Sequence, residues 1–222
     1  MKKTLSIILA VILSLGMLAG CTTQKEQENN EEITSVEENA NVVYPLPETL
    51  NVEALDNCTV PVSLEKGSAY VDDSGKMVMD VTVYSYEVYD MVDIASLKEN
   101  DTIVRKNEEV KITEIERLDT GLVRINGGEE NGGFDLASND SGVYYEIGMN
   151  DIKAYYELGK ATIPVSDEFE FVDESDIEAD AKQYFAGDLL TESEIVYDFT
   201  PYNTSIVIEN GTVIKMNKVY MP

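Results

Sequence analysis

An alternation of apolar and polar side chains with a period of two residues is the feature that most constrains this fold. It is clearest where Met79, Val81 and Val83 alternate with Asp80 and Thr82. Successive side chains of a β-strand point to opposite faces, so such a segment buries one face and exposes the other. Segments rich in strand-forming residues recur along the chain between turn residues. The sequence therefore predicts a mainly β fold, either an antiparallel sheet, a sandwich or a barrel-like arrangement, with α+β as the alternative.

The alternation changes phase after Val83, because Tyr84 and Tyr86 become the bulky residues. One extra residue in a strand would produce this slip, so we expect a β-bulge near Val83–Tyr84. Turn residues at 72–75 precede the strand, and residues 68–71 are its expected hairpin partner.

Residues 94–103 and 109–115 resemble the strand–turn–strand opening of many small β-barrels. Asn100 stands where that pattern usually has glycine, and asparagine is one of the few other residues that visit the left-handed conformation. The pattern occurs in unrelated proteins and implies geometry only. Four further strands are expected, at residues 121–125, 143–147, 152–158 and 161–165.

The strongest hairpin signal lies near the C-terminus. Residues 205–209 and 212–216 are rich in β-branched side chains and are separated by Asn210-Gly211. Both central residues of a type I′ turn need positive φ angles, which Asn-Gly adopts readily, so a two-residue turn is predicted.

One short α-helix is predicted near residues 176–186. Ser175 and Glu178 have the spacing of a capping box, and Gly187 is the expected terminator. Four larger or apolar residues then share one helical face: Ile177, Ala181, Tyr184 and Phe185.

The first twenty residues have the pattern of an export signal. Lys2 and Lys3 give a positive start, and residues 5–18 are almost wholly apolar. A membrane-spanning helix needs about 20 apolar residues, so this run is at the short end for a span. Residues 1–20 are therefore expected to be a signal peptide.

Leu18-Ala19-Gly20-Cys21 follows the apolar run and resembles the lipobox of bacterial lipoproteins. The resemblance covers the signal region alone. It implies cleavage between Gly20 and Cys21 and a diacylglycerol, with fatty acyl chains such as palmitate, on the Cys21 thiol. Two or more acyl chains anchor a protein stably. The expected location is the extracytoplasmic face of a cell membrane, with the lipid anchor as the contact to that membrane.

Residues 21–47 are predicted to form an acidic, flexible tether that begins at the lipidated cysteine. Residues 22–41 are dense in Glu, Asn and Gln, and such a segment buries too little apolar surface to offset its chain entropy. Residues 48–222 are enough for one β-rich globular domain. Whether that domain has one core or two small subdomains stays open.

The charge of the chain excludes several functions. Loss of Lys2 and Lys3 with the signal leaves 14 of the 16 basic residues against 43 acidic ones, a net charge of −29. Such a surface repels nucleic acid, so no nucleic-acid partner is expected. The expected partner is a protein or a glycan.

The residue inventory assigns no catalytic residue. The chain has no histidine, which removes Ser-His-Asp and Cys-His catalysis and most zinc sites. Once Cys21 is acylated, Cys58 is the only other cysteine, so no internal disulfide can form. We interpret Cys58 as a small apolar packing residue.

One glycine-rich segment is a weak calcium candidate. Residues 126–135 contain four glycines together with oxygen ligands of the kind that calcium takes. The candidate ligands are Glu129, Glu130, Asn131 and Asp135, although their spacing does not match an EF-hand. The alternative is a hairpin tip with glycines at positive φ.

Three functions remain after these exclusions. The first is a non-enzymatic lipoprotein whose β-rich module binds or assembles at the cell surface, where paired tyrosines would stack on a peptide or a sugar. The second is a glycan hydrolase that works with two carboxylates. The third is the solute-binding component of a transporter, although the chain lacks the alternating strand–helix units expected there.

Overall fold

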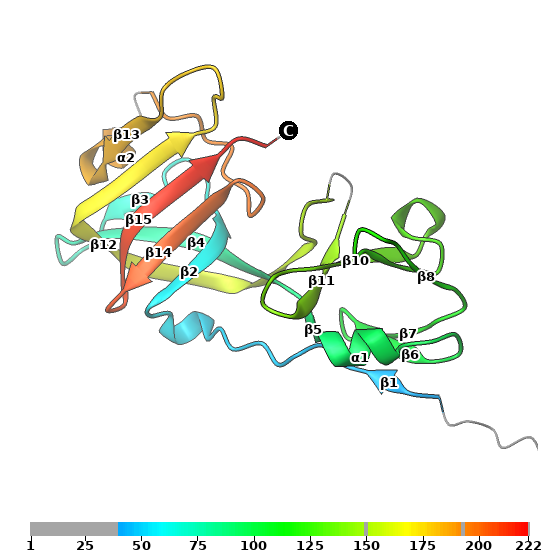
Figure 1. The fold of residues 1–222 in the computed structure, drawn as a ribbon. Coiled ribbons are helices and arrows are strands. Elements are labelled where there is room, and N and C mark those ends of the chain that lie inside the picture. Colours follow the sequence, from blue (N-terminus) through cyan, green and yellow to red (C-terminus); the bar gives the residue numbers. More distant parts are fainter. Residues whose placement is uncertain (1–39, 149–150, 192–193, 222) are drawn as a thin grey trace, which may run out of the picture. The chain divides into compact units, whose positions relative to one another are not determined.

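The computed structural model describes residues 40–148, 151–191 and 194–221 (Figure 1). The predicted signal peptide, the lipobox and residues 21–39 of the tether lie outside the described residues. Within the described residues, no helix has both the length and the apolar character to cross a membrane.

The described chain is mainly β, as predicted. Its helices are α1 (Met91–Ser96) and α2 (Ala186–Thr191), with 3-10 turns η1 (Val52–Ala54) and η2 (Glu129–Asn131). Its strands are β1 (Val42–Val43), β2 (Cys58–Ser63), β3 (Ala69–Val71), β4 (Met77–Tyr86), β5 (Val88–Asp90), β6 (Thr102–Arg105), β7 (Glu108–Lys111), β8 (Ile115–Arg117), β9 (Val123–Ile125), β10 (Phe134–Ser138), β11 (Val143–Ile147), β12 (Tyr155–Glu174), β13 (Lys182–Phe185), β14 (Thr204–Glu209) and β15 (Thr212–Val219).

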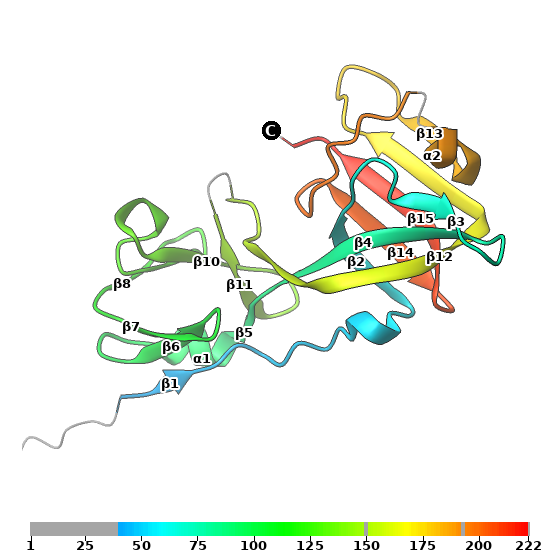
Figure 2. The same cartoon turned by 180° about the vertical axis from the view of Figure 1, so that it is seen from behind.

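Five strands close into a ring, so the barrel-like arrangement is the one observed. The pairing order is β2–β4–β12–β15–β14 and back to β2, and every pair is antiparallel except β12–β15. This is the Greek-key order of an OB-type barrel, which fixes the fold and leaves the function open. The long strand β12 completes the ring, because its first half lies along β4 and its second half along β15 (Figures 1 and 2).

The barrel encloses one hydrophobic core. Alternate residues of each strand point inward, and α2 adds the buried Leu189. Representative core side chains are Val62, Val83, Phe171, Ile206 and Met216.

A second, separate hydrophobic core forms mainly from residues between β4 and β12, together with Val43 of β1. The sheet β5–β11–β10–β9–β8 and the sheet β1–β6–β7 contribute to it, together with α1. Its fully buried members include Tyr89, Ile94, Ile103, Ile125 and Leu136. The described chain thus has two clusters of buried apolar side chains.

The predicted tether ends earlier than residue 47. Val42 and Val43 pair with Thr102 and Ile103 of β6, and Val43 is buried in the second core. The Asn41 N–H also donates to the Asp101 carboxylate. Apolar Val-Val following a polar run was the available signal that order begins here.

The predicted helix at residues 176–186 is wrong in position. The Asp173 carboxylate accepts from the N–H and hydroxyl of Ser175, and Asp176 accepts from the Glu178 N–H. These local bonds give the backbone an alternative to a helix. Tyr184 instead belongs to β13, where its ring stacks on Phe171 at 5.3 Å.

The real helix α2 begins ten residues later and is capped differently. The Asp188 carboxylate accepts from the Phe185 N–H at 2.8 Å, which is one half of a capping box. Gly187, the expected terminator, is the second residue of this helix.

The predicted bulge lies in the facing strand. Strand β4 keeps its alternation through Tyr86, with Val83 and Ser85 buried. Opposite it, Glu157 pairs with Tyr84 and Gly159 pairs with Val83, so one extra residue sits in β12. The two strands predicted at 152–158 and 161–165 are accordingly parts of one long strand.

Two predicted left-handed turns are present. Asn210 and Gly211 have φ angles of 51° and 69°, as a type I′ turn requires, and Asn100 has a φ of 74°. The Asn100 N–H donates to the Ile112 carbonyl at 2.8 Å, which holds this turn against the second core.

The turn at Asn100 makes a prediction about stability. Asn100→Gly should leave the free energy of unfolding nearly unchanged, whereas Asn100→Val should lower it by about 1–2 kcal/mol, because a β-branched residue resists positive φ. Urea unfolding followed by circular dichroism measures both. Equal stability of the two variants would contradict this role of residue 100.

Candidate functional site

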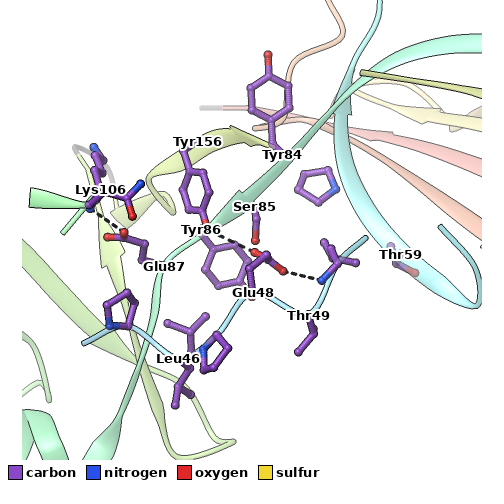
Figure 3. A pocket seen from close by; sticks show the side chains of 16 residues that line it. Leu46, Glu48, Thr49, Thr59, Tyr84, Ser85, Tyr86, Glu87, Lys106 and Tyr156 are labelled. Atoms are coloured by element: carbon purple, nitrogen blue, oxygen red, sulfur yellow. Dashed lines mark hydrogen bonds between the residues drawn. The ribbon is translucent and has the colours of Figure 1, made fainter. Parts of the chain in front are cut away.

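A groove of about 760 Å³ lies in the part of the chain that the structure describes. Three stretches supply most of its lining: residues 45–50, residues 84–88 and the β2 residues Thr59 and Pro61, joined by Tyr156 (Figure 3). Its lining includes three prolines, three tyrosines, two carboxylates and one lysine. These members are Pro45, Pro47, Pro61, Tyr84, Tyr86, Tyr156, Glu48, Glu87 and Lys106.

The alternation of β4 places two of these tyrosines. Val83 points into the barrel and Ser85 lies on the same face of β4, so Tyr84 and Tyr86 lie on the opposite face of the strand. The Tyr84 and Ser63 hydroxyls are 3.1 Å apart, which ties Tyr84 to the neighbouring strand β2. Tyr84 and Tyr86 are both among the residues that line the groove, as are Ser85 and Tyr156, its pairing partner in β12.

The opposite wall is an extended proline-rich segment. The Leu46 N–H donates to the Val88 carbonyl at 2.6 Å. The Glu48 carboxylate accepts from the Leu50 N–H at 3.0 Å and from the Tyr156 hydroxyl at 3.4 Å (Figure 3). Burial, and then the nearby Glu48 charge, raises the pKa of the Tyr156 phenol. Glu48 therefore joins the segment to the barrel.

Glu87 joins the groove to the second core. Its carboxylate accepts from the Lys106 N–H at 2.7 Å and from the Tyr89 hydroxyl at 3.0 Å. Burial of Tyr89, followed by the Glu87 charge, raises the pKa of the Tyr89 phenol. The Lys106 ammonium lies 3.5 Å from a carboxylate oxygen of Glu146.

This arrangement is suited to binding. Tyrosine faces and proline rings offer flat apolar surfaces with polar edges. Both groove carboxylates already accept hydrogen bonds from donors of the chain, and so they hold the walls in place. The groove can therefore accept a ligand with apolar surface and a few polar groups.

All four calcium candidates, Glu129, Glu130, Asn131 and Asp135, line one recess, and two of them have side-chain partners within the chain. Asp135 accepts from the Arg124 guanidinium at 3.2 Å, and the Asn131 side chain donates to the Gly127 carbonyl at 2.8 Å. Glu129 and Glu130 lie in η2. Within the described residues, no group of three or more acidic or cysteine side chains is placed to hold a metal ion.

The tyrosines of β4, β5 and β12 differ in their surroundings. Tyr84, Tyr86 and Tyr156 line the groove, whereas Tyr89 is fully buried in the second core. Cys58 is half-buried, and burial raises the pKa of its thiol. Glu48 and Glu87 carried no sequence signal, because their roles depend on contacts with distant residues.

Comparisons of the chain with protein-family models, with curated proteins and with solved structures find no match. The functional argument consequently rests on this chain's own residues.

Proposed function

We propose that this protein is a lipid-anchored, extracytoplasmic binding module. Leu18-Ala19-Gly20-Cys21 after a short apolar run supports acylation of Cys21. The acidic residues that follow support a spacer between the membrane and the folded part. Two acyl chains would hold the module stably at the surface of the membrane.

The groove is the observation that carries the binding function. It combines three tyrosines, three prolines and two carboxylates in one recess of about 760 Å³. That volume lies in the range of ligand sites in proteins. A surface peptide or a glycan chain presents the mixed apolar and polar character that this lining fits.

A second candidate is the carboxylate-dependent glycan hydrolase. Its support is that Glu48 and Glu87 line the same groove. We place it second because both carboxylates bind N–H or O–H groups of the chain. Glu48→Gln and Glu87→Gln should each abolish glycan hydrolysis if the hydrolase is correct, and purified protein should show none if the binding module is correct.

Acylation is tested by changing each cysteine in turn. Cells fed an alkyne-bearing fatty acid should label the wild-type protein and the Cys58→Ser variant, and both should sediment with membranes. Cys21→Ser should lose the label, because its hydroxyl cannot form the thioether on which the anchor depends. The chain has two cysteines, so Cys58→Ser is a matched control. A labelled Cys21→Ser protein would contradict the proposal.

A further inference from the structure

A lysine side chain occupies a group of tyrosine rings next to the groove. The Lys153 ammonium lies 4.1 Å from the centre of the Tyr86 ring and 5.1 Å from the centre of the Tyr145 ring. Both distances are within the range over which ring faces attract cations. A backbone bridge between Ile147 and Lys153 holds this lysine beside β11.

The rings form a continuous, mutually supporting set. Tyr86 meets Tyr145 and Tyr155 edge to face, each with ring centres 5.8 Å apart. Tyr155 meets Tyr202 in the same manner at 5.5 Å. Edge-to-face packing is the favoured arrangement of aromatic pairs and fixes the ring orientations. The cage, defined here as Tyr86, Tyr145, Tyr155 and Tyr202, is therefore built from four separate parts of the chain.

The contacts of Lys153 are with aromatic rings. Within residues 40–148, 151–191 and 194–221, no ion pair joins Lys153 to a carboxylate, in contrast to Lys106 and Lys218. Tyrosine faces thus take the place of a carboxylate as the partner of this ammonium. Such an arrangement recognises an alkylammonium group by its charge and by its methylene stem.

We propose that the cage is a binding site for a lysine side chain of a partner polypeptide, and that Lys153 occupies it in the free protein. The inference deepens the proposed binding function and rests on it, because Tyr86 belongs to both the cage and the groove. A polypeptide lying in the groove could insert a lysine into the cage and displace Lys153.

Two observations favour lysine as the occupant. The present occupant is a lysine side chain, so the cage demonstrably accepts its shape and charge. The net charge of the chain without its first twenty residues is −29, and an acidic protein raises the local concentration of basic ligands.

The test measures binding of a short acetylated and amidated Gly-Lys-Gly peptide to the full chain, solubilised in detergent. Tyrosine fluorescence follows binding, because the chain has no tryptophan to dominate the emission of its 13 tyrosines. Lys153→Ala should bind this peptide roughly tenfold more tightly than wild type, since the internal competitor is gone. Lys160→Ala, a change in β12 among the lining of a different recess, should leave the affinity unchanged.

Substitutions that remove a tyrosine ring should weaken binding of the peptide. Tyr86→Leu should abolish binding in both the wild-type and the Lys153→Ala backgrounds, whereas Tyr86→Phe should retain it, because phenylalanine keeps a ring face. In the free wild-type protein, ring currents should move the ε-methylene protons of Lys153 upfield, and saturating peptide should return them to their ordinary position.

Several results would overturn the proposal. The first is that Lys153→Ala binds the peptide with unchanged affinity. The second is that a peptide acetylated on its lysine side chain binds as tightly as the unmodified peptide. The third is preferential binding of phosphocholine, which would assign the cage to a lipid headgroup. Acylation is read at Cys21 by a separate assay, so failure of the anchor and failure of the cage are distinguishable.

Discussion

Asp198→Ala is expected to destabilise the fold more than Lys218→Met, which replaces the buried lysine that Asp198 pairs with. Lys218 is 1% exposed, and its ammonium forms an ion pair with Asp198, whose side chain is 59% exposed. The remaining partners of that ammonium are the Val196 carbonyl at 3.2 Å and the Phe199 ring at 5.3 Å. Removing the carboxylate leaves a buried charge without its counter-ion, at a cost of about 3 kcal/mol.

Replacing the buried lysine instead of the aspartate should cost less stability. Lys218→Met removes the buried charge, fills a similar volume and returns the Asp198 carboxylate to water, so we expect a loss of about 1 kcal/mol or less. Urea unfolding of both single variants and the double variant forms a complete cycle. The double variant should be as stable as Lys218→Met alone. A larger loss for Lys218→Met than for Asp198→Ala would contradict this account of the pair.

Gly133→Ala should strongly destabilise the second core. A Cβ atom at this position would lie 1.9 Å from the Ile125 carbonyl oxygen and 2.6 Å from that of Asn126. Ile125 is the last residue of β9 and Asn126 follows it. Because both clashing atoms belong to the backbone, the hairpin of β9 and β10 would have to open. We expect a loss of about 3 kcal/mol in the free energy of unfolding.

The neighbouring glycine provides a matched control. Gly132 has a φ of 86°, and an added Cβ would have no heavy atom within 4 Å. Gly132→Ala should therefore cost only the left-handed strain of about 1–2 kcal/mol. Thermal unfolding followed by circular dichroism compares the two. A Gly133→Ala variant as stable as Gly132→Ala would show that the backbone near Ile125 relaxes freely.

Local patterns predicted the fold where the structure depends on local physics. Alternation located the strand at Met77–Tyr86, and Asn-Gly located the last hairpin. Both follow from side-chain period and turn geometry, which adjacent residues determine. The left-handed conformation of Asn100 is likewise a feature that local sequence predicted.

Prediction failed where two local signals competed. Residues 175–185 have helical spacing and a capping box, but Asp173 and Asp176 also form side-chain bonds to nearby backbone. The decisive contact is the stacking of Tyr184 on Phe171. That contact joins residues that the sequence alone could not pair.

The groove illustrates the same limit for function. The Leu46 N–H bonds to Val88, and the Tyr156 hydroxyl bonds to Glu48, so its walls join residues 42 and 108 positions apart. Tyrosine alternation indicated one wall. The predicted boundary between tether and domain, at residue 47, falls inside the proline-rich wall, because nothing in residues 45–50 themselves shows what they contact.

Mass spectrometry of the N-terminal tryptic peptide of the protein isolated from its own cells tests the central proposal most directly. The first lysine after the signal is Lys25, so the expected peptide spans residues 21–25 and begins at Cys21. The proposal predicts that this peptide carries the mass of a diacylglyceryl group on sulfur. A peptide that begins elsewhere, or that contains Cys21 as a free thiol, would contradict a lipid-anchored module.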